Sequence, residues 1–186
     1  MKKLGFLMLM SAFALMLGGS ALAQDNSYYF TTYYSNANTA NAPDATLRII
    51  NDGDTEQNLW AAIYVFDDSE ELTECCACLI TPDGLLSESI NKNLTANPLT
   101  GIKPTRGVIK VISSNGSDPT APIPIAGLRE WATHVQKAGT GFAVTETLGA
   151  DSNLAQSEQT LLGQLCYFDG LLSGKRCTCT PEDADF

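Results

Sequence analysis

Cysteine is the residue type whose number and spacing in this chain point most directly to chemistry. The six cysteines form two tight clusters that lie far apart in the sequence, namely Cys75, Cys76, Cys78 and Cys166, Cys177, Cys179. In an exported chain an even number of cysteines indicates a disulfide framework. Adjacent cysteines, or cysteines two residues apart, pair only with strain. We therefore expect three disulfides that each join one cluster to the other, in a pairing that the sequence leaves open.

Two alternatives remain for the same six side chains. Thiolates at these spacings could bind Zn²⁺ or Cu⁺, although no histidine stands near either cluster in the sequence. A redox-active pair is also conceivable, but the Cys-x-x-Cys spacing of such pairs is missing. A periplasmic thiolate metal-binding or redox protein is thus the alternative to a disulfide-linked one, and we predict no cofactor.

The amino-terminal segment has the three parts of a secretory signal peptide. Two lysines precede an apolar run over residues 4–17, and Ala21-Leu22-Ala23 offers small residues at the positions that signal peptidase reads. We expect residues 1–23 to be removed and residues 24–186 to form a single domain with no membrane span. Such a chain would be exported to the periplasm, the cell surface or the medium.

The net charge of the chain excludes some classes of binding partner. The formal net charge is −10 at pH 7, so the surface repels nucleic-acid phosphates and anionic lipid. The remaining partner classes are a protein or a carbohydrate at the cell surface.

His134 is the only histidine and would have to act as the base of any Ser/His/Asp hydrolase. No Gly-x-Ser-x-Gly motif accompanies it. We therefore predict no catalytic residues and a chain that is not an enzyme.

Two further groups of residues are weaker candidates for binding. Oxygen ligands could hold Ca²⁺ in the acidic run, but the run lacks the alternating spacing of a calcium loop and reads more simply as a surface turn. Exposed aromatic side chains could stack on sugars or on partner strands, but an ordinary first strand explains them equally. The acidic residues are Asp67, Asp68, Glu70 and Glu71, with Glu74 in the same acidic loop, and the aromatic residues are Tyr28, Tyr29, Phe30, Tyr33 and Tyr34.

The elements that must position these residues are mostly strands. Alternating or apolar runs predict six strands, over residues 27–34, 45–50, 59–66, 85–94, 107–113 and 142–148. Helical spacing predicts two short helices, over about residues 125–137 and from Ser157 to Gly170 or Gly174. We expect a mainly β fold, a single antiparallel β-sandwich that is Ig-like in general shape, with the helices packed on an edge or an end and the whole cross-linked by disulfides.

Several sequence blocks resemble an uncharacterised family of exported, cysteine-containing bacterial proteins. The similarity covers residues 45–179, and its blocks are Tyr64–Asp68, Glu74–Gly84, Leu128–Gln136, Leu165–Phe168 and Cys177–Cys179. The resemblance implies export and a single domain, and it transfers no site residues. Together these features predict a non-enzymatic exported protein that serves as a cell-envelope, surface, adhesion or assembly component.

Overall fold

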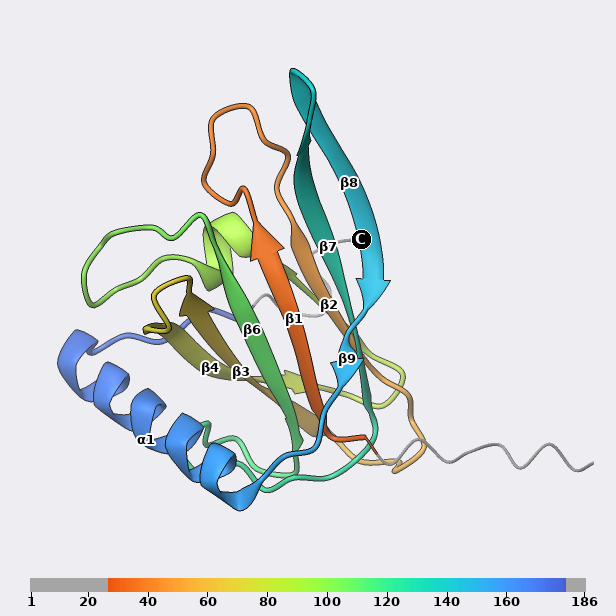
Figure 1. Ribbon diagram of the computed structural model, residues 1–186. Helices are drawn as coiled ribbons and strands as arrows, with labels where there is room; N and C mark the ends of the chain where they lie inside the picture. The colour runs from red at the N-terminus through yellow and green to blue at the C-terminus, as the bar shows by residue number, and fades with distance from the viewer. Residues whose placement is uncertain (1–26, 180–186) are drawn as a thin grey trace, which may run out of the picture.

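The computed structural model describes residues 27–179, so the predicted signal peptide lies outside the described residues. Within this range the chain forms nine strands, one α-helix and one short π-helix, arranged as two antiparallel sheets (Figure 1). The predicted mainly β composition is therefore confirmed.

The first sheet has five strands in the order β4-β3-β6-β1-β9. Neighbouring strands pair antiparallel throughout. In chain order their bounds are β1 (Tyr29–Ser35), β3 (Leu59–Asp67), β4 (Leu72–Ile80), β6 (Arg106–Ser114) and β9 (Ala150–Asp151).

The second sheet has four strands in the order β5-β2-β7-β8, and it is also antiparallel. Its strands are β2 (Thr46–Asn51), β5 (Leu85–Ser89), β7 (Leu128–Ala138) and β8 (Gly141–Leu148). Figure 1 shows the hairpin of β7 and β8 extending past the end of β1.

One hydrophobic core joins the two sheets. Ile63 of β3 and Ile109 of β6 pack in the same buried cluster as Leu47 and Ile49 of β2. Strand alternation explains this arrangement, because every second side chain points to the same face. The apolar runs of β3 and β6 therefore supply the core of the fold.

The helix predicted over residues 125–137 is wrong, because this segment is strand β7. Leu128, Trp131, Ala132 and Val135 happen to satisfy helical spacing, but β7 pairs with β2 on one side and β8 on the other. Pairing on both sides fixes an extended conformation, and tertiary context of this kind overrides a local helical pattern.

The strand predicted over residues 85–94 is only half right. β5 ends at Ser89, and residues Ile90–Leu94 form the π-helix η1. The Ser89 hydroxyl accepts a hydrogen bond from the backbone N–H of Lys92 at 3.0 Å, which caps the new helix and ends the strand.

The predicted carboxyl-terminal helix is confirmed as α1 (Gln156–Ser173), which ends at Gly174 in a left-handed conformation. Leu162 and Cys166 of α1 pack on Tyr64 of β3 and Ile112 of β6 in a second buried cluster. The helix thus covers one face of the first sheet rather than an edge or an end. Among the described residues no helix is long and apolar enough to cross a membrane.

Candidate functional site

Three disulfides connect strand β4 to the chain after residue 165. Each joins one predicted cluster to the other, as the sequence indicates, with Cα–Cα separations between 5.3 and 5.7 Å. The pairs are Cys75–Cys166, Cys76–Cys177 and Cys78–Cys179. Three such bridges indicate an oxidising, non-cytoplasmic environment.

The bridges lie on two faces of β4 because neighbouring strand residues point in opposite directions. Cys75 lies on the face that α1 covers, and its bridge to Cys166 is fully buried. Cys76 and Cys78 point to the opposite face and belong to the core between the sheets. The segment after α1 must therefore pass around the edge of β4 to reach them.

This segment runs alongside β4, which is an edge strand of its sheet. Cys76 pairs with Cys177 and Cys78 with Cys179, so the two segments run in the same direction. The backbone N–H of Cys177 also donates to the carbonyl of Cys75 at 3.3 Å, as in a parallel ladder. Residues 177–179 thus cover part of an edge that would otherwise be open.

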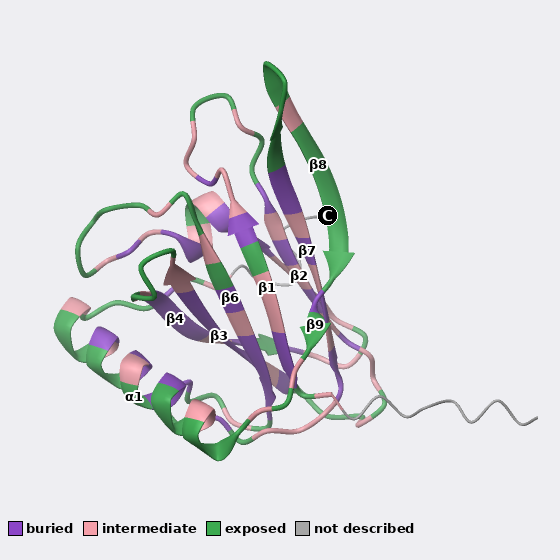
Figure 2. Ribbon diagram, in the orientation of Figure 1, coloured by how far each residue is buried: buried purple, intermediate pink, exposed green. Residues whose placement is uncertain are grey.

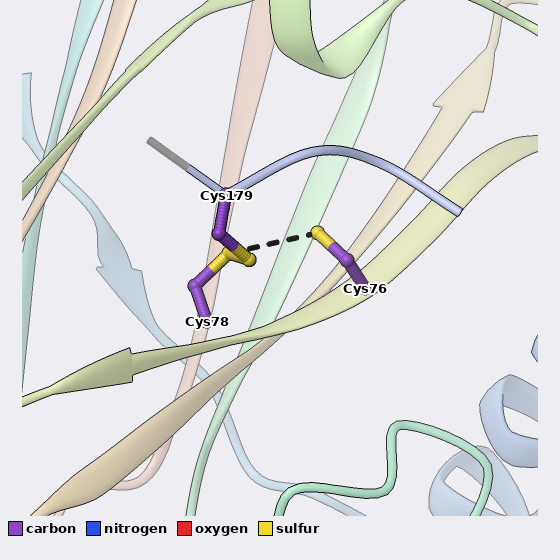
Figure 3. A group of neighbouring side chains, drawn as sticks. All are labelled: Cys76, Cys78 and Cys179. Atoms are coloured by element: carbon purple, nitrogen blue, oxygen red, sulfur yellow. Dashed lines mark hydrogen bonds between the residues drawn. A yellow bond between two sulfur atoms is a disulfide. The ribbon is translucent and has the colours of Figure 1, made fainter. Parts of the chain in front are cut away.

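Three sulfur atoms gather where this segment meets β4. The Sγ atoms of Cys76, Cys78 and Cys179 lie within 4.8 Å of one another, and those of Cys76 and Cys78 are 3.8 Å apart (Figure 3). Figure 3 shows Cys76 and Cys78 rising from one strand toward Cys179. In the oxidised protein all three atoms belong to disulfides and none is a thiolate.

An open pocket of about 360 Å³ adjoins two of the bridges. Cys76, Cys177 and Cys179 line it, together with the charged side chains of Arg176 and Asp118. The guanidinium Nη1 of Arg176 lies 3.5 Å from Sγ of Cys166, so this cation stands close to the sulfur atoms. Of the cysteines that line the pocket, Cys179 is half-buried, while Cys177 and Cys76 are only 7% and 3% exposed; neither cysteine of the third bridge lines it.

Two buried carboxyl groups stand near the same bridges, and the sequence predicted the burial of neither, since Glu74 was expected in a surface turn. Glu74 precedes Cys75 and accepts the backbone N–H of Ala96 at 3.0 Å, while burial raises its pKa to about 7. Asp169 lies one turn beyond Cys166 on α1, and burial raises its pKa although Arg176 opposes the shift. For Asp169 the sequence did offer a signal, because it follows Cys166 by three residues and residues three apart share a helix face.

His134 is buried inside the protein rather than placed at an open cleft. Its ring stacks on Tyr33 at a centroid distance of 4.0 Å, and Nε2 lies 2.6 Å from the hydroxyl of Thr147. Burial lowers its pKa, and a backbone interaction with Tyr33 partly opposes this shift. The surroundings of His134 fit a structural residue.

Four of the predicted acidic residues lie at the turn between β3 and β4, whereas the expectation that Glu74 belongs to a surface loop is wrong, because it is buried in β4. The Asp67 carboxylate accepts the backbone N–H groups of Ser69 and Glu71 at 2.8 and 3.0 Å, and Asp68 pairs with Arg106 at 2.6 Å. The Asp67 carboxylate therefore stabilises the turn, while the Asp68 carboxylate forms an ion pair with β6.

The aromatic block divides between the core and the surface. The predicted contact residues Tyr29, Phe30 and Tyr34 are buried, whereas Tyr28 and Tyr33 are 37% and 44% exposed. These five side chains therefore do not form one aromatic surface.

Strand β8 is a second candidate site because it is the outer strand of its sheet and is exposed along nearly its whole length (Figure 2). The backbone N–H of Gly149 donates to the carbonyl of Glu130 at 2.8 Å, so these opposed residues form a hydrogen-bonded pair. In an antiparallel ladder such pairs alternate with unbonded ones. The backbone groups of every second residue of β8 therefore point away from β7, and these residues are Phe142, Val144, Glu146 and Leu148.

The fold and the site define a disulfide-linked, mainly β protein. No family model matches the chain, and no curated protein matches it. A crystal structure of Thermotoga maritima 1070 aligns with a TM-score of 0.44 and 14% sequence identity over 68% of this chain and 94% of that chain. Similarity at this level assigns neither a fold nor an activity.

Proposed function

We propose that this chain is an exported, non-enzymatic assembly component of the cell envelope or cell surface, and that copies associate through the open edge of β8. In this proposal the two sheets form a β-sandwich, Ig-like in general shape. The disulfides support export, because such bridges form and persist in oxidising compartments.

The exposed edge of β8 is the observation that carries the proposal. An edge strand with free N–H and C=O groups is a template for pairing with another strand. β8 has eight residues, contains no proline or lysine, and has Glu146 as its single charged residue. These are features that leave an edge open to association rather than protected from it.

The two sheets have four edge strands, which are β4 and β9 in the first sheet and β5 and β8 in the second. Residues 177–179 are bridged along the outer side of β4, so that edge is partly covered. β9 has only two residues, and β5 alternates half-buried and buried positions, whereas β8 is exposed along nearly its whole length. Pairing through this long exposed edge favours a closed two-fold dimer, in which the same surface of each copy pairs with itself.

The positions of the outward-facing groups select one register for such a dimer. Antiparallel pairing centred on Thr145 sets Val144 of each copy opposite Glu146 of the other, and Phe142 opposite Leu148. Every outward-facing backbone group then finds a partner, and the two Glu146 carboxylates are not directly opposed.

A cysteine at the centre of this register tests the proposal. Directly opposed residues in an unbonded antiparallel pair have Cα atoms about 4.5 Å apart, which a disulfide can span. Thr145→Cys should therefore give a covalent dimer under mild oxidation. Ala143→Cys is the matched control, because residue 143 faces Thr147 of the other copy and cannot meet itself.

A proline variant tests the same edge without a new thiol. Val144→Pro removes one outward-facing N–H and leaves the β7 ladder intact, and edge strands tolerate proline. The molar mass of each variant is measured by light scattering. The proposal predicts a dimer for the unchanged chain and for Val144→Ala, and a monomer for Val144→Pro. A monomer for the unchanged chain at millimolar concentration, or equal cross-linking at residues 143 and 145, would overturn it.

A further inference from the structure

We propose that Cys76, Cys78 and Cys179 form a binding site for a soft monovalent metal ion, Cu(I), after the two disulfides beside the pocket are reduced. This site is separate from the β8 edge and does not depend on the proposed function.

The three disulfides differ in how a reductant can approach them. Cys76, Cys177 and Cys179 line the open pocket; Cys179 is half-buried, and Cys177 and Cys76 are 7% and 3% exposed. Cys75 and Cys166 are both 0% exposed beneath α1. Thiol–disulfide exchange requires access to a sulfur atom, so the two pocket bridges should be reduced before the third.

The third disulfide keeps the reduced site assembled. Cys75–Cys166 ties α1 to β4, and Cys177 follows Cys166 by only eleven residues. The N–H of Cys177 also remains within reach of the Cys75 carbonyl. Cysteines released at residues 177 and 179 therefore stay at high effective concentration beside β4.

The reduction balances with an external dithiol as the electron donor. One thiolate of the dithiol attacks Sγ of Cys179, which breaks the Cys78–Cys179 bond and releases Cys78 as a thiolate that takes up a proton. The second thiolate of the dithiol then breaks the mixed disulfide, frees Cys179, and leaves the donor oxidised to its own disulfide. The same two steps at Cys177 open the Cys76–Cys177 bridge, so each bridge receives two electrons and two protons.

The sulfur geometry suits a three-coordinate ion. An ion about 2.3 Å from each of three thiolates requires sulfur–sulfur separations of about 4 Å. The Sγ atoms of Cys76 and Cys78 are already 3.8 Å apart on one face of β4, and Cys179 need only withdraw from bonding distance.

The ligand set favours Cu(I) over harder ions. No histidine or carboxylate joins this sulfur group among residues 27–179, and sulfur-only sites select soft metals. Reduction also releases Cys177, but only the Sγ atoms of Cys76, Cys78 and Cys179 form a group within 4.8 Å of one another, whereas structural zinc sites use four ligands in a tetrahedron. The bound thiolates carry excess negative charge, and Arg176 in the same pocket supplies an opposing cation.

The first experiment follows the order of reduction. The oxidised chain is titrated with dithiothreitol, the thiols are alkylated, and the modified cysteines are mapped by mass spectrometry. We expect modification of the four cysteines of the pocket bridges while Cys75–Cys166 remains intact. Earlier or simultaneous reduction of Cys75–Cys166, or trapping of a Cys76–Cys78 disulfide, would overturn the proposal.

The second experiment adds Cu(I) to the partly reduced chain without oxygen. We expect one copper per chain, ultraviolet sulfur-to-copper charge-transfer absorption, and an X-ray absorption spectrum with three sulfur neighbours. Copper bound with fewer sulfur neighbours, or Zn²⁺ retained in preference to Cu(I), would contradict the assignment.

Variants distinguish Cu(I) binding at this site from Cu(I) binding to any exposed thiol. Cys78→Ser combined with Cys179→Ser leaves two thiols after reduction, and should weaken Cu(I) binding by more than the roughly 10–100-fold that loss of an outer-shell partner costs. Asp118→Asn is the matched control, because it alters the pocket and keeps every sulfur atom. Equal Cu(I) affinity in the two variants would refute a site built from these cysteines, and circular dichroism establishes that both are folded.

Discussion

The carboxyl group of Glu130 fills the space beside Gly149 that a side chain there would occupy. A Cβ atom built on Gly149 would lie 3.0 Å from the carboxyl carbon of Glu130, while the two backbones share a hydrogen bond of 2.8 Å. Neither carboxyl oxygen has a hydrogen-bond partner among the described residues. The glycine thus makes room for a buried acid near the start of β7.

Glu130 should make the protein less stable at high pH. Burial raises its pKa to about 8 from the ordinary value of 4.5, so between these values the folded chain holds a proton that the unfolded chain releases. The free energy of unfolding must then fall as pH rises through this range. We expect Tm to be lower at pH 9 than at pH 5, on the order of 5–10 °C.

Thermal denaturation of Glu130→Gln checks the assignment. Glutamine has no proton to lose, so the decline of Tm with pH should become shallower. Glu71→Gln, at an exposed position in the turn after β3, should leave the decline unchanged. An unaltered decline in Glu130→Gln would mean that other groups are responsible.

His134 should titrate below its ordinary range. Burial holds its pKa below 6.5, so its share of stability declines as pH falls below about 6.5, because the unfolded chain then binds the proton first. The chain has one histidine, and its ring protons can be followed by NMR without ambiguity. The midpoint should lie below the midpoint of the same chain in urea, and coincident midpoints would rule out the buried position.

Gly163 should be indispensable for the docking of α1. A Cβ atom at this position would lie 2.2 Å from the carbonyl oxygen of Thr120, a backbone atom that cannot easily move. Gly163→Ala should therefore cost at least about 2 kcal/mol of unfolding free energy. Gly170→Ala in the same helix meets only the flexible end of Arg176 and should be neutral or slightly stabilising. Equal urea midpoints for the two variants would contradict this packing.

Removal of one disulfide should lower the free energy of unfolding by less than the number of residues between its two cysteines suggests. With Cys76–Cys177 intact, the Cys75–Cys166 bridge closes only a small extra ring, which is worth about 3 kcal/mol of chain entropy. Replacing Cys75 and Cys166 by alanine should lower stability by about that amount, measured by urea denaturation. Replacing Cys78 and Cys179 removes a still smaller ring and should lower the free energy of unfolding by less. A larger loss for this pair than for Cys75 and Cys166 would contradict the chain-entropy explanation.

The sequence predicted those parts of the fold whose local pattern agrees with their final surroundings. Strand β3 was recognised from its nearly continuous apolar run, and α1 from the helical spacing of its leucines. The apolar face expected for α1 was wrong, because Leu161, Phe168 and Leu172 are exposed and the helix buries Leu162 and Cys166 instead. Strand β7 was not recognised, since its apolar residues fit a helical period and only pairing with β2 and β8 decides the matter. Strand β4 was missed because half of its buried residues are cysteines and two more are polar, so it lacks an apolar strand pattern.

The candidate site was also only partly predictable. The clusters could be paired from the strain of the alternatives, but the order of pairing depends on which face of β4 each cysteine occupies. The burial of Glu74 and Glu130 depends on residues distant in the sequence, so no local pattern announces it. The outward-facing groups of β8 became visible only once the register with β7 was known.

The placement of all three bridges between β4 and the segment that follows residue 165 also constrains the order of events during biogenesis. None of the native cross-links can close until that late segment has reached the oxidising compartment beside the earlier strands. Oxidation before then can only join cysteines of the first cluster to one another or to another molecule. Maturation should therefore depend on keeping Cys75, Cys76 and Cys78 reduced while synthesis continues, or on an isomerase that corrects their premature partners.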